Sequence, residues 1–457
     1  MHEGPEISTT PSVPAQRVPE SDESTGAEAV AGARGVAGRG GRSRILLAGG
    51  AALGVLLAGL VIFRPGVSPK AAPSNRPAAS ASATPYDKAV ATLNAQTAAM
   101  GSGDEDGWLA AVDTGLKARY RSLYRNLRGL GVTSVHYGTS AGRPVKGDRS
   151  ALSMRVGLFY CFGDDMCPKY TNYREPLPHI SQVLTLRPVG GKYVITALGV
   201  EPQPGYDEPL PWESGDLTFA QGKRVVVAAG AGEQKYLETV LPVAERAASV
   251  ADHYAALNGA PQKRYRIFLA SEKQWKSWYG GTKDNWWIGL TVPLDKRGLD
   301  VMIRMAEMDD PLTLATTVQH ELGHVVTLTG AFDGAAEEYR WVSEGVAEYI
   351  GWRPKPAAQS RRRYSVRWKL KGGTPKSMVP VEPGPDAPDR ALDTFYGLSH
   401  LAVDCMAKKY GEAKMFTFVK LLLTQSDNDL DKAARAAYGL PFGTVDHACA
   451  AWIKTQV

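Results

Sequence analysis

The sequence predicts an α+β protein: a single transmembrane helix, then a small domain of helices and a curved sheet, then a larger α+β domain. Three observations support this fold class. A chain of 457 residues is longer than one hydrophobic core usually holds. The 19 residues from Ile45 to Phe63 contain no charged or strongly polar side chain. After residue 86, segments with helical periodicity give way to short β-rich runs, an order typical of α+β domains.

The first 85 residues divide into three segments by composition. Residues 1–44 almost lack large apolar side chains, which predicts a disordered tail. Residues 45–63 would form a helix about 28 Å long, close to the hydrocarbon thickness of a bilayer, which predicts a transmembrane helix. Residues 64–85 have the Pro/Ala/Ser composition of an extended linker. A cleaved signal peptide fits less well, because 44 residues precede the apolar stretch.

These segments predict a location as well as a structure. The cysteines all follow the predicted span, and they are typical of the exported part of a protein. We therefore expect a single-pass protein of the cell membrane, with a cytoplasmic N-terminus and with the globular domains outside the cell.

Composition excludes several classes of protein. Apolar residues make up 44% of the chain and charged residues 22%, which is ordinary globular usage and excludes wholesale disorder and fibrous architecture. The net charge of +6 is small for this length, so we expect no nucleic-acid partner. Four widely spaced cysteines without a CxxC motif argue against a cysteine zinc ribbon.

Residues 86–215 predict the small domain. Two helices are expected at Tyr86–Met100 and Gly107–Arg128, the second with a single apolar stripe. The β-rich runs that follow are Thr133–Tyr137, Ala151–Phe162, Ile180–Arg187 and Lys192–Leu198. This order resembles the cone-shaped folds of the cystatin and nuclear-transport-factor type. No catalytic set of residues occurs in this stretch, so a binding or spacer role is expected.

The four cysteines allow three pairings. The short loop between Cys161 and Cys167 and the division into domains favour Cys161–Cys167 together with Cys405–Cys449. Four buried free thiols remain the alternative.

One motif carries chemistry: His320-Glu321-Leu322-Gly323-His324. Asp310 and Pro311 supply a helix start, and apolar residues then recur at helical spacing, which predicts a helix from Pro311 to Leu328. On a helix, His320 and His324 lie one turn apart and can bind the same metal ion. Glu321 would take a proton from a metal-bound water. The alternative is an ordinary helix with two solvent-facing histidines.

A second motif follows the first. Trp341-Val342-Ser343-Glu344-Gly345-Val346-Ala347-Glu348-Tyr349 places Glu344 twenty residues after His324. The pair resembles the gluzincin metallopeptidases, the MA-like zinc peptidases of thermolysin and aminopeptidase type. The resemblance implies that residues 216–457 form a zinc metallopeptidase domain with one Zn²⁺ and that the reaction is peptide hydrolysis.

The resemblance also implies roles for single residues. Glu344 would be the third metal ligand, and Gly345 would let the two motif helices approach closely. Glu348, one turn further on, would accept the second ring hydrogen of a ligating imidazole. Tyr396 would donate a hydrogen bond to the developing oxyanion, or would only cap and pack its helix. The strand Leu299–Met305 would be either a substrate-binding sheet edge or a core strand.

Other features have less specific interpretations. The tryptophans at 275, 278, 286 and 287 are expected in the core rather than in a substrate groove. The arginines at 361, 362 and 363 would lie in a solvated loop or bind a polyanion. We expect His253, His400 and His447 to be structural.

Together these features predict a membrane-anchored, outward-facing zinc peptidase that acts on a peptide or protein substrate. The absence of the aminopeptidase Gly-x-Met-x-Asn loop favours endopeptidase action. The alternative is a non-catalytic cell-envelope binding or scaffold protein whose metal site is degenerate or structural. The intact Glu321 argues against that alternative, because a structural site has no use for this carboxylate.

Overall fold

The computed structural model describes residues 83–140, 142–162, 179–200, 209–213, 215–281, 287–293, 298–332, 334–371, 373–384, 387–427 and 429–457. The predicted tail (1–44), the predicted transmembrane helix (45–63) and all but the last three residues of the predicted linker (64–85) lie outside these residues.

The fold-class prediction needs a correction. Within the described ranges the chain is a mixed α/β structure, and no helix there is long and apolar enough to cross a membrane. The two longest helices, α4 (Leu237–Asn258) and α10 (Asp389–Tyr410), have the necessary length. Each nevertheless carries several charged residues, because only one side of the helix faces the core. The predicted single transmembrane helix is therefore not part of the described fold.

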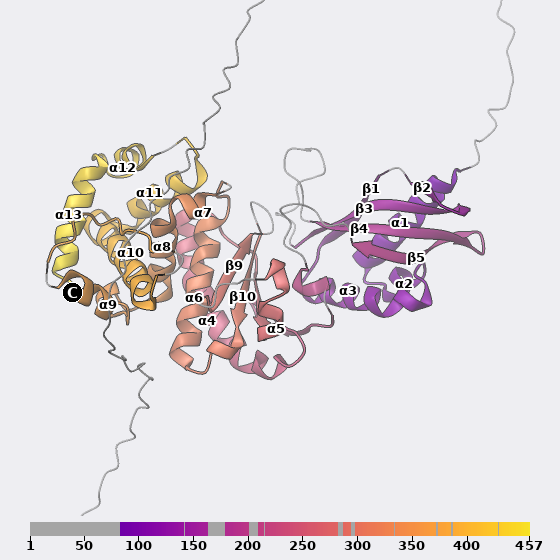
Figure 1. Ribbon diagram of the computed structural model, residues 1–457, viewed down its shortest axis with the longest axis horizontal. Helices are drawn as coiled ribbons and strands as arrows, with labels where there is room; N and C mark the ends of the chain where they lie inside the picture. Colours follow the sequence, from indigo (N-terminus) through magenta and orange to yellow (C-terminus); the bar gives the residue numbers. More distant parts are fainter. Residues whose placement is uncertain are drawn as a thin grey trace, which may run out of the picture. The chain divides into compact units, whose positions relative to one another are not determined.

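The first part of the chain is a helical layer followed by an antiparallel sheet (Figure 1). Its helices are α1 (Pro85–Ser102), α2 (Glu105–Leu109) and α3 (Lys117–Gly129). Its strands are β1 (Ser134–Thr139), β2 (Arg143–Val145), β3 (Asp148–Cys161), β4 (His179–Val189) and β5 (Lys192–Val200). They pair in the order β1-β3-β4-β5, with β2 paired to β3.

One predicted helix of this part is interrupted in the structure. The expected helix Gly107–Arg128 ends after Leu109, and α3 begins at Lys117. Between them, the Asp113 carboxylate accepts the backbone N–H of Gly115 and caps a short 3₁₀ turn. Aspartate and glycine favour such a turn over a continuous helix, and this local preference outweighs the apolar periodicity.

A second sheet follows in the chain. Its strands are β6 (Thr218–Gln221), β7 (Val225–Ala229), β8 (Tyr265–Ala270), β9 (Gly289–Pro293) and β10 (Leu299–Arg304). They lie in the order β6-β7-β8-β10-β9, with β7, β8 and β10 parallel and β6 and β9 antiparallel to their neighbours. Every residue of β7, β8 and β10 is buried, as expected for parallel strands covered on both faces.

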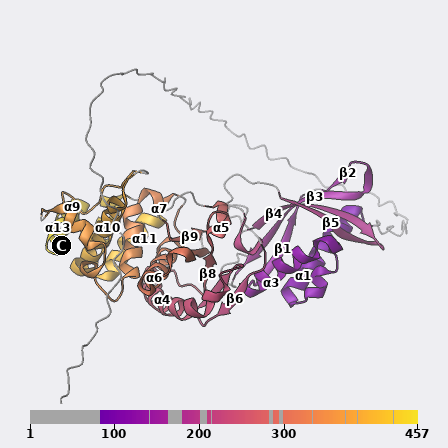
Figure 2. The same ribbon diagram turned by 60° about the horizontal axis from the view of Figure 1, so that its bottom comes forward.

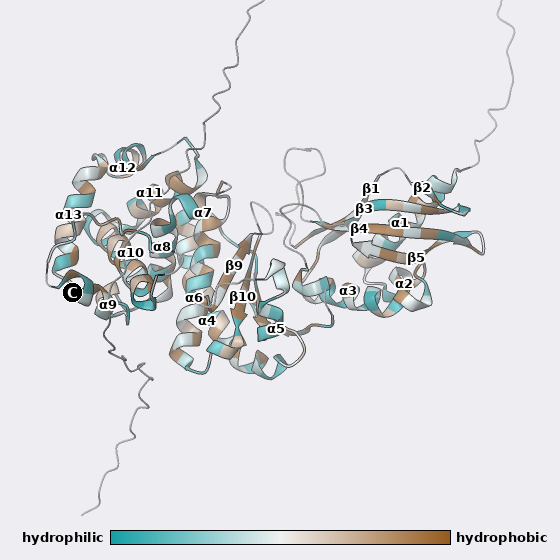
Figure 3. Cartoon of the chain, viewed as in Figure 1, coloured by the Kyte–Doolittle hydropathy of each residue, from teal (hydrophilic) through white to brown (hydrophobic). Residues whose placement is uncertain are grey.

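The two faces of this sheet contact different cores. One face contributes Val227, Ile267 and Val301 to a core shared with α4 and with α6 (Pro311–Leu328). Figures 1 and 2 show α4 and α6 side by side. In Figure 3 the strands are largely hydrophobic, whereas α6 carries both hydrophobic and hydrophilic residues.

The opposite face packs against aromatic side chains. Trp275 and Trp278 are buried there, and Trp287 packs against the same core. These three tryptophans are core residues, as expected, and Trp286 lies outside the described residues.

The remaining helices build the C-terminal part. Apart from the short α5 (Glu272–Trp275), which packs against β8 and β10, they are α7 (Ala335–Glu338), α8 (Arg340–Gly351), α9 (Arg363–Leu370), α11 (Glu412–Thr424), α12 (Leu430–Tyr438) and α13 (Phe442–Lys454). A disulfide between Cys405 and Cys449 joins α10 to α13, which confirms that predicted pair. Cys167 of the other predicted pair lies outside the described residues.

Candidate metal centre

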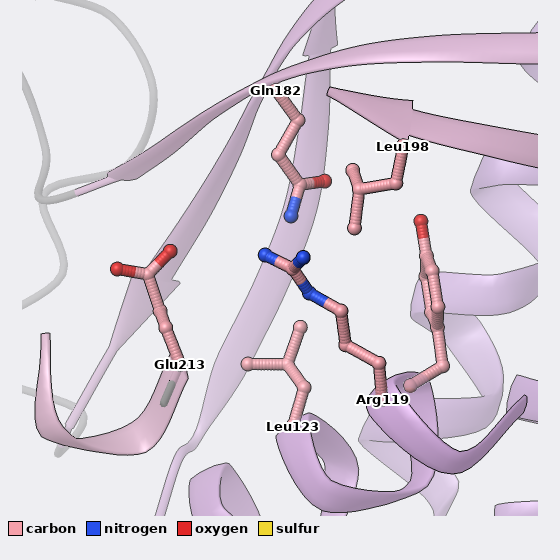
Figure 4. Close-up of a pocket in the computed structure, with 6 residues that line it drawn as sticks. Arg119, Leu123, Gln182, Leu198 and Glu213 are labelled. Carbon is pink, nitrogen blue, oxygen red and sulfur yellow. The ribbon is translucent and has the colours of Figure 1, made fainter. Parts of the chain in front are cut away.

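A small pocket and a separate group of metal-binding side chains occur in the described part of the fold. A small pocket in the first part is lined by α3, β4, β5 and the turn Pro211–Glu213, with Arg119 extended toward Gln182 (Figure 4). It contains no cluster of metal-binding side chains. Among the described residues, His320, His324 and Glu344 alone form a group of three whose ligand atoms lie within 4.8 Å of one another.

The histidine helix α6 starts where the sequence predicts. The Asp310 carboxylate accepts the backbone N–H groups of Leu312 and Thr313 at 3.3 and 3.1 Å, and Pro311 occupies the first turn. From this start, His320 and His324 come one turn apart, with ring centroids 4.9 Å from each other. Both rings therefore project from one face of α6 toward α8.

Gly323 and Gly351 let α6 and α8 approach closely. The expected Gly345 does not lie at this contact. A Cβ atom on Gly323 would lie 2.9 Å from the Cα atom of Ala347, and one on Gly351 would lie 3.0 Å from the Cβ atom of His320. A Cβ atom on Gly345 would instead lie 2.6 Å from the carbonyl oxygen of Ser399 on α10. The prediction that Gly345 serves the α6–α8 approach is wrong, because this residue faces the other side of α8.

The geometry of the three candidate ligands suits a metal ion. Glu344 Oε2 lies 3.4 Å from His320 Nε2 and 3.2 Å from His324 Nε2. Ligand atoms around a tetrahedral zinc with bonds near 2.1 Å are about 3.4 Å apart. Glu344 Oε2 is also buried without a hydrogen bond of normal geometry. A buried carboxylate oxygen that faces two imidazole nitrogens and has no hydrogen bond of normal geometry fits a Zn²⁺ site.

The second nitrogen of each imidazole has its own partner. His320 Nδ1 lies 3.3 Å from Glu348 Oε1, and His324 Nδ1 lies 3.3 Å from the hydroxyl oxygen of Ser343. Such contacts fix the ring orientation and leave both Nε2 atoms for a metal. Ser343 was not singled out in the sequence, although it stands next to Glu344 in the second motif.

Glu348 is buried, and its carboxylate accepts hydrogen bonds from two further side chains. Arg362 Nε and Trp352 Nε1 each donate a hydrogen bond to its carboxylate at 3.0 Å. Burial alone would raise the pKa of Glu348, but Arg362 and His320 outweigh it and lower this pKa to about 2. Burial likewise opposes the charged form of His320, yet Glu344 and Glu348 raise the pKa of that imidazole to about 10 in the metal-free protein. Metal binding at His320 therefore has to displace a proton.

Glu321 is not part of the ligand group and lies against β9. The Thr291 hydroxyl donates a hydrogen bond to Glu321 Oε2 at 2.7 Å, and Gly289 leaves room for the other carboxylate oxygen. The strand beside the site is thus β9, which ends the sheet. The predicted strand Leu299–Met305 is β10 and has neighbours on both sides, so of its two interpretations the core strand is confirmed and the sheet edge is excluded.

Tyr396 of α10 lies at the rim of the centre. Its ring centroid is 6.3 Å from that of His320, and its hydroxyl is close enough to Arg340 to interact with that charge electrostatically. Burial raises the pKa of the Tyr396 phenol, so the group stays protonated and can donate a hydrogen bond. Arg340 Nε is 3.9 Å from Glu344 Oε1, and its NH1 donates to Glu382 at 2.6 Å. Tyr396 and Arg340 thus share one side of the candidate metal site.

Two neighbouring arginines of the run, Arg361 and Arg362, have different surroundings. Arg361 pairs with Asp310 at 3.1 Å, and both side chains are about half exposed. Arg362 points inward to Glu348. The sequence does not predict this contact, because no local pattern shows which arginine of the run faces the core. His400, expected to be structural, is buried, and burial lowers its pKa to about 4.

Comparison with models of known protein families and with curated proteins found no match to this chain. A function for the site therefore has to be argued from the residues themselves.

Proposed function

We propose that this chain is a zinc-dependent metallopeptidase whose site resembles that of the gluzincins. The observation that carries the proposal is the convergence of His320, His324 and Glu344, with ligand atoms spaced as around one tetrahedral metal ion. Three protein ligands leave a fourth position for water, as catalytic zinc sites require.

Glu321 distinguishes a catalytic site from a structural one. Its carboxylate is free of the ligand group, is held by Thr291, and lies between the histidine helix and the terminal strand β9. A carboxylate in this place can accept a proton from the attacking water and return it to the leaving amine. The bound Zn²⁺ would supply Lewis-acid polarisation of the scissile carbonyl and of that water.

The other residues around the site have supporting roles in this proposal. Glu348 and Ser343 orient the two imidazoles, and Tyr396 offers a protonated phenol to the oxyanion that develops during hydrolysis. The strand β9 ends the described sheet and would present main-chain groups to an extended peptide substrate.

The disulfide bears on where this activity would occur. The Cys405–Cys449 bond joins two helices of the proposed catalytic domain. Because disulfides persist mainly in oxidising compartments, we infer that the domain acts outside the cytoplasm.

The proposal is tested by digestion of a broad peptide library with the purified chain. We expect cleavage that a strong chelator abolishes and that one equivalent of zinc per chain restores. Bound zinc without any cleavage would favour the alternative, a binding or scaffold protein with a structural metal site. Cleavage that survives removal of the metal would contradict a zinc-based mechanism.

A further inference from the structure

Arg362 is the middle residue of the arginine run and contacts three groups around the metal centre. Its Nε donates to Glu348 Oε1 at 3.0 Å, and its NH1 donates to Asp393 Oδ1 at 2.6 Å. Its guanidinium carbon lies 4.6 Å from the centre of the Tyr396 ring, a cation–π distance. The planar side chain therefore joins a carboxylate of α8, a carboxylate of α10 and the tyrosine of α10.

The contact with Glu348 connects Arg362 to a candidate ligand. The same oxygen, Glu348 Oε1, lies 3.3 Å from His320 Nδ1, while Trp352 donates to Glu348 Oε2. Glu348 is 2% exposed, so these donors alone set the direction of its carboxylate. A shift of Arg362 would turn the carboxylate and, with it, the ring of His320.

We propose that Arg362 is a positioning residue of the metal centre, which holds His320 through Glu348 and the Tyr396 ring through its guanidinium face. This inference rests on the proposed function, since it assumes that His320 binds zinc. It explains why Arg362 is directed into the protein, whereas the preceding Arg361 is exposed. It also predicts that a single change at Arg362 affects both metal affinity and the rate of turnover.

The shape of the side chain matters as well as its charge. Nε and NH1 of Arg362 reach two different acids, and the flat face of the group covers a ring. A lysine has one point charge and cannot make these three contacts together. We therefore expect Arg362→Lys to be defective, although the net charge is unchanged.

The test measures zinc affinity of the full chain by competition with a chromogenic chelator. Arg362→Gln should weaken zinc binding by roughly 10–100-fold, the usual effect of losing a group that orients a ligand. Arg362→Lys and Asp393→Asn should weaken it less, and in the same direction. The matched control is Arg361→Gln, which removes the same charge from the same run and should leave zinc affinity unchanged.

A second readout separates positioning from simple stabilisation. Tyr396→Phe should lower the turnover number in the wild-type background and have a smaller effect on top of Arg362→Gln, because the two residues act together. Unchanged zinc affinity in Arg362→Gln and Arg362→Lys, together with lower melting temperatures, would overturn the inference and leave Arg362 a structural ion pair. Because zinc affinity is measured without substrate, wild-type protein that binds zinc but cleaves no peptide would contradict the proposed function and not this inference.

Discussion

At the candidate metal centre, the two nitrogens of each imidazole of α6 face different partners. The Nε2 atoms of His320 and His324 face Glu344, whereas their Nδ1 atoms face Glu348 and Ser343. The two glutamates of α8 are four residues apart and lie on the same side of the helix. Of these two carboxylates, only that of Glu344 has a buried oxygen without a hydrogen bond. Mutations of the two residues should therefore have different effects.

Glu344→Ala should abolish stoichiometric zinc binding, because it removes one of the three proposed ligands. Glu348→Ala should weaken zinc affinity by roughly 10–100-fold and leave residual activity at high zinc, because all three proposed ligands remain. Metal analysis of the purified variants checks both. The assignment would be wrong if Glu348→Ala were metal-free while Glu344→Ala still bound zinc.

Tyr396→Phe removes only the phenol oxygen. If this group stabilises the oxyanion, the turnover number should fall about 10-fold or more while the melting temperature changes little. Tyr364→Phe is the matched control, because Tyr364 is 60% exposed and lies on the outside of α9. Equal kinetics for both variants would remove Tyr396 from the reaction.

At the scale of elements, the site depends on how closely α6 and α8 pack. Gly323 has the backbone of α8 at Ala347 directly against it. Local signals were enough to predict α6 itself, since Asp310 and Pro311 start the helix and apolar residues continue it. They could not show which glycine faces which helix, or that the five-residue β9 forms the sheet edge beside Glu321, because both depend on tertiary packing.

Gly323→Ala tests that packing. Replacing glycine by alanine inside a helix usually stabilises it by up to about 1 kcal/mol. Here the added methyl group would lie 2.9 Å from the Cα atom of Ala347, so we expect a lower melting temperature and weaker zinc binding. Gly101→Ala in α1 is the control, because nothing lies within 4 Å of the added carbon and the variant should be no less stable than wild type. Wild-type stability and zinc affinity in Gly323→Ala would contradict the close approach.

At the scale of the whole molecule, the centre is assembled from segments far apart in the chain. Residues of β9, α6, α8 and α10, together with Arg362 just before α9, surround it. The HExxH and Glu344 motifs could be recognised in the sequence because their spacing is local. Arg362, Thr291 and Arg340 could not, because only the folded chain brings them to the site. The predicted transmembrane helix is not part of the described fold.

The disulfide constrains α10, one of the helices around the candidate site. The Cys405–Cys449 bond closes 44 residues of chain, for which loop entropy gives a stabilisation of about 4 kcal/mol. The double variant Cys405→Ala/Cys449→Ala should therefore melt at a clearly lower temperature in calorimetry. A melting temperature equal to that of the wild type would show that the bond does not constrain the domain.

Glu321 is the proposed base of a zinc peptidase, and one comparison tests this role most directly. Wild type and Glu321→Gln are loaded with zinc, and peptide hydrolysis is measured alongside bound metal per chain. Glutamine keeps the shape of glutamate but cannot accept the proton, so we expect equal zinc content and turnover lower by at least about 100-fold. Undiminished turnover in Glu321→Gln, or loss of the metal together with the activity, would contradict this role.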